Sequence, residues 1–264
     1  MKTIELLAKA VAILFCVFGS PAAVASNICA GQIVAVNDMG IETTAPDIAT
    51  AIISPVIDVA GDGYVGDEDG HGTRMAQIIA GRCEDALGVA PDAQIVFQSI
   101  MNSNTDRAYI AKPYSSIFEK AMILGAYIQN NSWGVMNATD YLRISAEADA
   151  FVYQHPEVAL VFAAGNGNEI VAPALASNVI TVGQTGTRYT RVQSRKSEPD
   201  VYAPGQYGGN WGHSVMTETG SSVSSAVVSG LLALMRGKFI EIYEHTPSAA
   251  LLKATIINNQ KLCN

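Results

Sequence analysis

The hydrophobic residues of the chain gather in short continuous runs, and longer stretches with a helical pattern separate them. Four runs are apolar enough to be strands buried on both faces: 32–36, 94–100, 158–164 and 179–182. Four other stretches are typical of helices: 73–80, 115–127, 141–153 and 221–235. This alternation predicts a three-layer α/β fold, with a mostly parallel central sheet and helices on both faces. No linker or repeat divides the pattern, so we expect one domain.

Polar residues closely follow two of the predicted strands. Asp38 comes shortly after the first run, and Asn166 follows the third run within a glycine-rich stretch. In open parallel sheets, ligands bind at the carboxyl ends of the strands. Asp38 and Asn166 are therefore the first candidates for a functional site.

The composition excludes several classes of protein. Of the 264 residues, 49% are hydrophobic and 15% are charged, which excludes an intrinsically disordered chain. The formal net charge of −8 gives no electrostatic basis for binding nucleic acid or an anionic membrane. The apolar segment 226–235 is too short to cross a bilayer, so we expect it to be a buried core helix.

The N-terminal residues predict a secretory signal peptide. Lysines flank the start of an uncharged apolar run at 10–19, and Ala23-Val24-Ala25 matches a small-x-small cleavage site. Removal of residues 1–25 would leave a domain at 26–264. We expect this domain to be secreted or periplasmic, without a membrane attachment. The alternative is an uncleaved membrane anchor.

Three cysteines remain after the predicted cleavage: Cys29, Cys83 and Cys263. In an exported protein, an odd number implies one disulfide and a free thiol, or no disulfide. All three pairings remain open. The spacings are not typical of a metal site.

Further motifs place polar side chains at turns. Gly70-His71-Gly72-Thr73 begins one predicted helix, Gly220-Ser221-Ser222-Val223 begins another, and Asn166 has a glycine on each side. Glycines leave an imidazole sterically open, and a serine in the first turn of a helix lies where the helix dipole favours negative charge. The amide of Asn166 can donate to an oxyanion. Each motif alone is more typical of an ordinary turn or cap.

Taken together and in this order, Asp38, the histidine motif and the serine motif resemble the subtilisin-like serine proteases, or subtilases. Four other segments also match that family: Gly88-Val89-Ala90-Pro91, Asn131-Ser132-Trp133-Gly134, 178–183 and 200–205. The resemblance extends over about 33–235. It implies the three-layer subtilisin-like fold and an endopeptidase that acts on polypeptides.

The resemblance implies a role for each matching residue. Ser222 would be the nucleophile that forms an acyl-enzyme, His71 the general base and acid, and Asp38 the group that orients the imidazole. Asn166 would bind the oxyanion together with the backbone N–H of Ser222. This chemistry requires no cofactor.

The resemblance also implies where the substrate binds. Ser132, Trp133 and Gly134 match the strand with which the family binds the substrate main chain, by strand addition. Trp133 stands where the family often has leucine. We expect its larger ring to narrow the primary specificity pocket.

Two features depart from the family pattern. Ala226 replaces a proline that stiffens the start of the helix after the nucleophile. The first predicted strand begins shortly after the cleavage site, so we recognise no pro-segment and expect unaided folding or a trans-acting folding or inhibitory partner. Both features also agree with an alternative, a catalytically weak peptide-binding protein. An α/β-hydrolase esterase is disfavoured, because Ser222 does not lie in Gly-x-Ser-x-Gly.

An acidic stretch before the histidine motif is similar to a calcium-binding loop. Asp58, Asp62 and Asp69 stand at positions 1, 5 and 12 of such a loop, and a glycine stands at position 6. Position 3 is Ala60, which offers no ligand, and no flanking helices are predicted. Because calcium is common in the family, a structural calcium ion at these three aspartates is one hypothesis. A solvated acidic loop is the other.

Overall fold

The computed structural model describes residues 30–53, 55–83, 86–105, 107–109, 112–135, 138–189, 196, 198–211 and 214–260. These residues form one α/β unit around a main hydrophobic core. The predicted signal peptide at 1–25 and two cysteines, Cys29 and Cys263, lie outside them. Export and cysteine pairing therefore remain predictions.

The central sheet has seven strands in the order β11-β10-β9-β8-β1-β5-β2, and every pairing is parallel. The strands are β11 (Val201–Ala203), β10 (Ile180–Gln184), β9 (Ala159–Ala163), β8 (Ile128–Asn131), β1 (Ile33–Asp38), β5 (Gln94–Ser99) and β2 (Ile57–Asp58). The four predicted strands correspond to β1, β5, β9 and β10. The sequence pattern missed the three short strands β2, β8 and β11.

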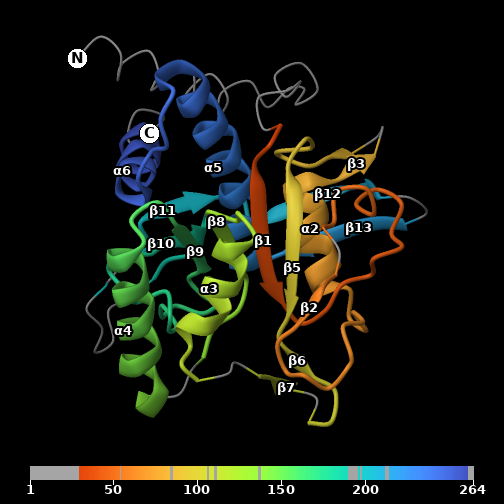
Figure 1. Ribbon diagram of the computed structural model, residues 1–264. Coiled ribbons are helices and arrows are strands. Elements are labelled where there is room, and N and C mark those ends of the chain that lie inside the picture. Colours follow the sequence, from red (N-terminus) through yellow and green to blue (C-terminus); the bar gives the residue numbers. More distant parts are fainter. Residues whose placement is uncertain are drawn as a thin grey trace.

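Helices cover both faces of this sheet, as Figure 1 shows. On one face, α2 (His71–Ala80) and α5 (Ser221–Tyr243) pack against each other and against the central strands. On the other face, α3 (Ser115–Ile123) and α4 (Ala138–Gln154) lie together. The C-terminal helix α6 (Ala249–Gln260), which the pattern did not predict, packs against β11 and α5. The predicted three-layer fold is confirmed.

The alternation of side chains along β1 decides where Asp38 points. Successive side chains of a strand face opposite sides of the sheet. Ala35 packs in a small cluster with Ala121 of α3, so odd-numbered side chains of β1 face that layer. Asp38 has the opposite parity and therefore faces α2, where its carboxylate meets His71.

The helix α5 forms the centre of the core. It has 23 residues, and its most apolar 18-residue window is 83% buried inside the protein. By length and composition alone it could cross a membrane, but its burial is typical of a core helix. The prediction of a buried helix over 226–235 is confirmed, and the helix is longer than expected at its C-terminal end.

Three antiparallel pairs of short strands lie outside the central sheet. Two of them are β3 (Arg82–Cys83) with β4 (Ala86–Leu87), and β6 (Met101–Asn102) with β7 (Arg107–Ala108). The third is a ribbon that consists of β12 (Gln206–Trp211) and β13 (Ser214–Thr219). The sequence pattern did not predict this ribbon. It leads directly into the first turn of α5.

The predicted C-terminal end of one helix is wrong. The helix expected over 115–127 ends at Ile123, because Gly125 adopts a φ of +84° that an α-helix cannot continue. The segment Ser132–Gly134 directly follows β8, whose ladder ends at Asn131, and its pairing with a substrate stays a prediction.

Candidate active site

The carboxyl ends of three neighbouring strands meet the N-termini of two helices. Asp38 is the last residue of β1, Ser132 directly follows β8, and Asn166 lies in the loop after β9. His71 is the first residue of α2, and Ser222 is the second residue of α5. The contacts described below join these residues in groups at one edge of the sheet.

Asp38 and His71 form a direct hydrogen bond. The Nδ1 atom of His71 lies 2.8 Å from Oδ1 of Asp38, and the same oxygen accepts the backbone N–H of Met39 at 2.8 Å. Asp38 is 1% exposed, so water does not compete for its carboxylate. This contact fixes the ring and makes Nδ1 the protonated nitrogen, which leaves Nε2 for proton transfer.

Gly72 explains how the helix comes close enough to the strand. A Cβ atom at this position would lie 2.1 Å from the carbonyl oxygen of Gly40 and 3.1 Å from Cβ of Asp38. Since real side chains do not fit at such distances, only glycine allows the first turn of α2 to pack on the end of β1. The Gly-His-Gly motif thus places the imidazole by close backbone contact.

The carboxylates around His71 set its charge state. Burial acts to lower the pKa of the imidazole, because its side chain is only 22% exposed. The charge and hydrogen bond of Asp38, with smaller effects from Glu218 and Asp69, outweigh burial and raise the pKa to about 9. At neutral pH the imidazole therefore carries a proton, which it must lose before it can act as a base.

Ser222 is half-buried at the start of α5, and its hydroxyl is held by the residue that follows β8. Its Oγ donates to the backbone carbonyl of Ser132 at 3.2 Å. The hydrogen bonds of the described residues do not include one between Ser222 and His71. The structure thus brings Asp38 and His71 together directly, whereas the hydroxyl of Ser222 is hydrogen-bonded to Ser132.

A network of buried polar side chains fastens α5 to β8. The hydroxyl of Ser132 lies 3.0 Å from the carbonyl oxygen of Ser222 and 2.9 Å from the hydroxyl of Ser225. Asn130 donates to Ser132 at 3.0 Å and accepts from Ser229 at 3.1 Å. The sequence analysis missed these partners. The available signal was an unusual number of serines in a helix that is otherwise apolar.

The side chain of Asn166 is oriented by Ser221. Its Oδ1 atom accepts the backbone N–H of Ser221 at 2.8 Å and the hydroxyl of Ser221 at 3.0 Å. The same hydroxyl accepts the backbone N–H of Gly165 at 3.1 Å. Gly220, with a φ of +130°, leaves room for this contact, because a Cβ there would lie 2.9 Å from Oδ1. With the carbonyl oxygen engaged, the amide N–H groups are the part of Asn166 that can serve a ligand.

A profile of the subtilase family matches residues 30–262 of the chain. The chain belongs to the subtilase family. Among curated relatives, subtilisin DY of Bacillus licheniformis is 28% identical over 218 residues, which cover 78% of this chain and 77% of that protein. A subtilisin-like protease 2 of Trichophyton equinum is 29% identical over 219 residues, 73% of this chain and 46% of that protein.

Other relatives are much longer than this subtilase. The Dictyostelium discoideum serine protease/ABC transporter B family protein tagD is 31% identical over 136 residues, which cover 46% of this chain and 8% of that protein. Among solved structures, sphericase superposes with a TM-score of 0.67 at 23% identity, covering 88% of this chain and 83% of that one. The S41 psychrophilic protease gives 0.68 at 20% identity, with coverages of 87% and 83%. These two likenesses show the fold.

The side chain of Trp133 in this subtilase packs mainly against hydrophobic core residues. Its ring packs edge to face on Phe162, with 5.5 Å between ring centroids, and contacts a small cluster that contains Tyr114 and Ile144. Gly134 is exposed beside it, at the end of the segment predicted to bind substrate. A narrowing of the specificity pocket by Trp133 remains a prediction.

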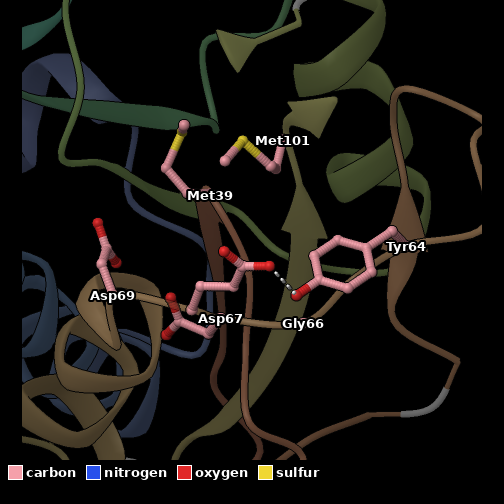
Figure 2. A pocket seen from close by; sticks show the side chains of 7 residues that line it. Met39, Tyr64, Gly66, Asp67, Asp69 and Met101 are labelled. Carbon is pink, nitrogen blue, oxygen red and sulfur yellow. Dashed lines mark hydrogen bonds between the residues drawn. The ribbon is translucent and has the colours of Figure 1, made fainter. Parts of the chain in front are cut away.

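A cavity of about 330 Å³ is lined by residues that are close in sequence to Asp38 and His71. Figure 2 shows the thioethers of Met39 and Met101 on one side and the carboxylates of Asp67 and Asp69 on the other. The remaining lining residues are Tyr64, Gly66 and Glu68. Met39 directly follows Asp38, and Asp69 comes two residues before the histidine. The cavity is therefore lined by sequence neighbours of Asp38 and His71, while these two residues are not among its lining residues.

The acidic loop does not fit a calcium site. Both carboxylate oxygens of Asp58 accept backbone N–H groups of glycines within the loop, at 2.7 Å each. Asp62 accepts from Ser103, and Asp69 accepts the backbone N–H of His71 at 2.8 Å. In the part of the chain that the structure describes, no group of three or more His, Cys, Asp or Glu side chains is placed to hold a metal ion. Calcium binding stays an untested prediction that this arrangement does not favour.

Proposed function

We propose that this subtilase is a secreted or periplasmic endopeptidase that hydrolyses peptide bonds of polypeptides through an acyl-enzyme on Ser222. The observation that supports this most strongly is the 2.8 Å hydrogen bond between Asp38 and His71 at the edge where α5 begins. A carboxylate that holds an imidazole beside a serine at a helix N-terminus is the arrangement that makes an alcohol nucleophilic.

The first half of the reaction forms the acyl-enzyme. The Ser222 hydroxyl leaves the Ser132 carbonyl and gives its proton to Nε2 of His71, while Oγ forms a bond to the carbonyl carbon of the peptide. The oxyanion accepts hydrogen bonds from the amide of Asn166 and the backbone N–H of Ser222. The imidazolium, stabilised by Asp38, then protonates the leaving amine as the C–N bond breaks.

The second half returns the enzyme to its starting state. A water molecule gives a proton to His71 and attacks the acyl carbon, and the same donors hold the second oxyanion. The Oγ–carbon bond breaks, the proton returns to Ser222, and a carboxylic acid product leaves. Asp38 stays ionised throughout. This chain's own residues therefore carry each proton transfer of the cycle, and the water molecule supplies the atoms that are added to the two products.

Labelling with a fluorophosphonate probe tests the proposal. The wild-type protein should react with the probe and hydrolyse casein, and Ser222→Ala should do neither. Ser116→Ala on α3, which covers the opposite face of the sheet, is the matched control and should behave as wild type. A folded wild-type protein that never reacts with the probe would contradict the assignment. N-terminal sequencing of exported protein tests the cleavage after Ala25.

The second candidate is a peptide-binding protein with little turnover. The hydrogen bond from Ser222 to Ser132 favours it, since this hydroxyl is not paired with the base. It predicts that calorimetry detects binding of casein peptides to both the wild type and His71→Ala, while neither protein forms product. Product formation by the wild type alone excludes this candidate.

A further inference from the structure

One arginine near the site contacts two segments that lead to proposed catalytic residues, through a hydrogen bond to one and an ion pair with the other. Arg74 lies on α2, one turn after His71. Its Nη1 atom donates to the backbone carbonyl of Asp69 at 2.8 Å, and its Nε atom forms a close ion pair with Oε2 of Glu218. Asp69 belongs to the loop that leads into His71, and Glu218 belongs to β13, which leads into Ser222.

The segment that contains Glu218 is the less supported of the two. The strand β13 pairs with β12 in a two-stranded ribbon and takes no part in the seven-stranded sheet. Only four positions separate Glu218 from Ser222, and Gly220 lies between them with a φ of +130°. A shift of the ribbon therefore moves the start of α5, and a contact that fixes β13 also fixes the nucleophile.

We propose that Arg74 is a positioning residue, whose guanidinium sets the spacing between the loop before His71 and the strand before Ser222. This inference rests on the proposed function of those two residues. The side chains of Arg74 and Glu218 are only 20% and 23% exposed, so water and salt screen this pair less than a surface pair. Gly70 leaves space for the guanidinium, because a Cβ there would lie 2.5 Å from Nη1.

The planar fork of arginine suits this task. It donates from Nη1 to a carbonyl and meets a carboxylate through Nε at the same time, whereas an ammonium group offers one compact centre at the end of a flexible chain. We therefore expect lysine at position 74 to keep the charge but lose most of the spacing function.

Arg74 also balances one of the charges around the base. The carboxylates that act on His71 come from Asp38 on β1, Asp69 in the preceding loop and Glu218 on β13, while Arg74 lies on the same helix as the histidine. Loss of Arg74 leaves Glu218 uncompensated and should move the rising limb of the pH profile of kcat/KM, which reports deprotonation of His71, to higher pH. Glu218→Gln should move it to lower pH. A general loss of structure would not produce two opposite shifts.

Steady-state kinetics with a chromogenic peptide test the proposal. Arg74→Ala should lower kcat by about 10- to 100-fold with KM changed less than about threefold, since small misplacements of reacting groups cost rates of this size. Arg74→Lys should recover only a small part. The charge swap Arg74→Glu with Glu218→Arg should regain at least about fivefold over Arg74→Ala, because it restores a contact between the two segments.

Arg143→Ala is the matched control. Arg143 also pairs with a glutamate, Glu147, but on α4 at the other face of the sheet. It should leave kcat unchanged. A kcat of Arg74→Ala within twofold of wild type, or equal losses for Arg74→Ala and Arg143→Ala, would overturn the inference.

Two further measurements separate the outcomes. If Arg74→Ala does not fold, the kcat values of Glu218→Gln and of the charge swap are compared with that of the wild type instead. Thermal unfolding is recorded for each variant. Fluorophosphonate labelling of the wild type separates this inference from the proposed function. A labelled wild type with an unaffected Arg74→Ala refutes only the positioning role, whereas an unlabelled wild type refutes the reaction itself.

Discussion

The two sides of the site are built in different ways. The side with Asp38 and His71 lies on the central sheet, where a 1% exposed carboxylate and the glycine-lined first turn of α2 leave no freedom to the ring. The side with Ser222 is reached from a two-stranded ribbon, and hydroxyl and amide side chains hold it to β8. Backbone packing places the proposed base, whereas side-chain hydrogen bonds place the proposed nucleophile.

This difference teaches where the site is adjustable. Close-packed backbone has few alternative arrangements, so the base side is fixed when the domain folds. Hydroxyl groups rotate and exchange partners at small cost, so the nucleophile side can change its bonding without a change of fold. Substitutions on the two sides should therefore differ in whether they affect chemistry, stability or both.

The largest effect is expected on the base side at Asp38. Asp38→Asn keeps the shape but is uncharged and can turn its NH2 group toward Nδ1, which favours the wrong tautomer and does not stabilise the imidazolium, so kcat should fall by about 10⁴-fold with KM nearly unchanged. Pre-steady-state and steady-state assays on peptide substrates measure this loss, and circular dichroism checks the fold. A loss below tenfold would mean that the 2.8 Å contact serves structure only.

The next effect is expected at the oxyanion donor. Asn166→Ala should lower kcat by about 10²–10³-fold, because one donor to the developing charge is lost. Ser221→Ala, which removes only the hydroxyl that orients Asn166, should cost less. Asn258→Ala on the exposed side of α6 is the control. Equal kcat for Asn166→Ala and the control would remove Asn166 from the reaction.

The charge of His71 predicts an alkaline pH profile. Because the base must be neutral and its pKa is raised to about 9, kcat/KM should rise about tenfold per unit between pH 7 and the pKa and level off above it. The charged imidazole stabilises the fold below about pH 6.5, and this contribution should vanish as the pH rises through about 9. Kinetics and urea unfolding from pH 6 to 10 check both, with His71→Ala as the reference. A kinetic plateau already at pH 7 would disagree with the charge distribution.

The smallest effects compare the stability of the two sides. Gly72→Ala forces a methyl group toward the backbone of Gly40 and should lower the free energy of unfolding by about 1–3 kcal/mol. Ser225→Ala removes one hydroxyl from the network at α5 and should cost about 1 kcal/mol. Thermal and urea unfolding measure both values. If Ser225→Ala proves the more damaging, side-chain bonding rather than backbone packing dominates this edge.

The sequence pattern predicted the parts of the molecule that depend on local periodicity. Apolar runs located β1, β5, β9 and β10, and the position of Asp38 after the first run anticipated its place at the sheet edge. The ribbon of β12 and β13 was missed, because it contains glycine and polar residues without a continuous apolar face. The calcium hypothesis was based on the spacing of acidic residues along the chain. In the structure, these carboxylates instead accept hydrogen bonds from backbone N–H groups at different places, in the loop, in Ser103 and in His71.

Side-chain partners were the least accessible to sequence analysis. Arg74 and Glu218 lie 144 positions apart, and neither belongs to a recognisable motif. Ser221 and Asn166 stood in separate motifs, and nothing in their spacing indicated a hydrogen bond between them. Such pairs depend on how the elements pack, which periodicity does not specify.

The burial of α5 has a consequence for how this protein tolerates change. Ser222 is the second residue of a 23-residue helix that passes through the centre of the molecule, so the position of its backbone depends on how that helix packs in the core. A packing defect far along that helix, near Leu232, should therefore lower kcat, although that position does not contact the substrate. Evolution of new specificity is expected to proceed through the loops around the edge, with the interior of α5 left as it is.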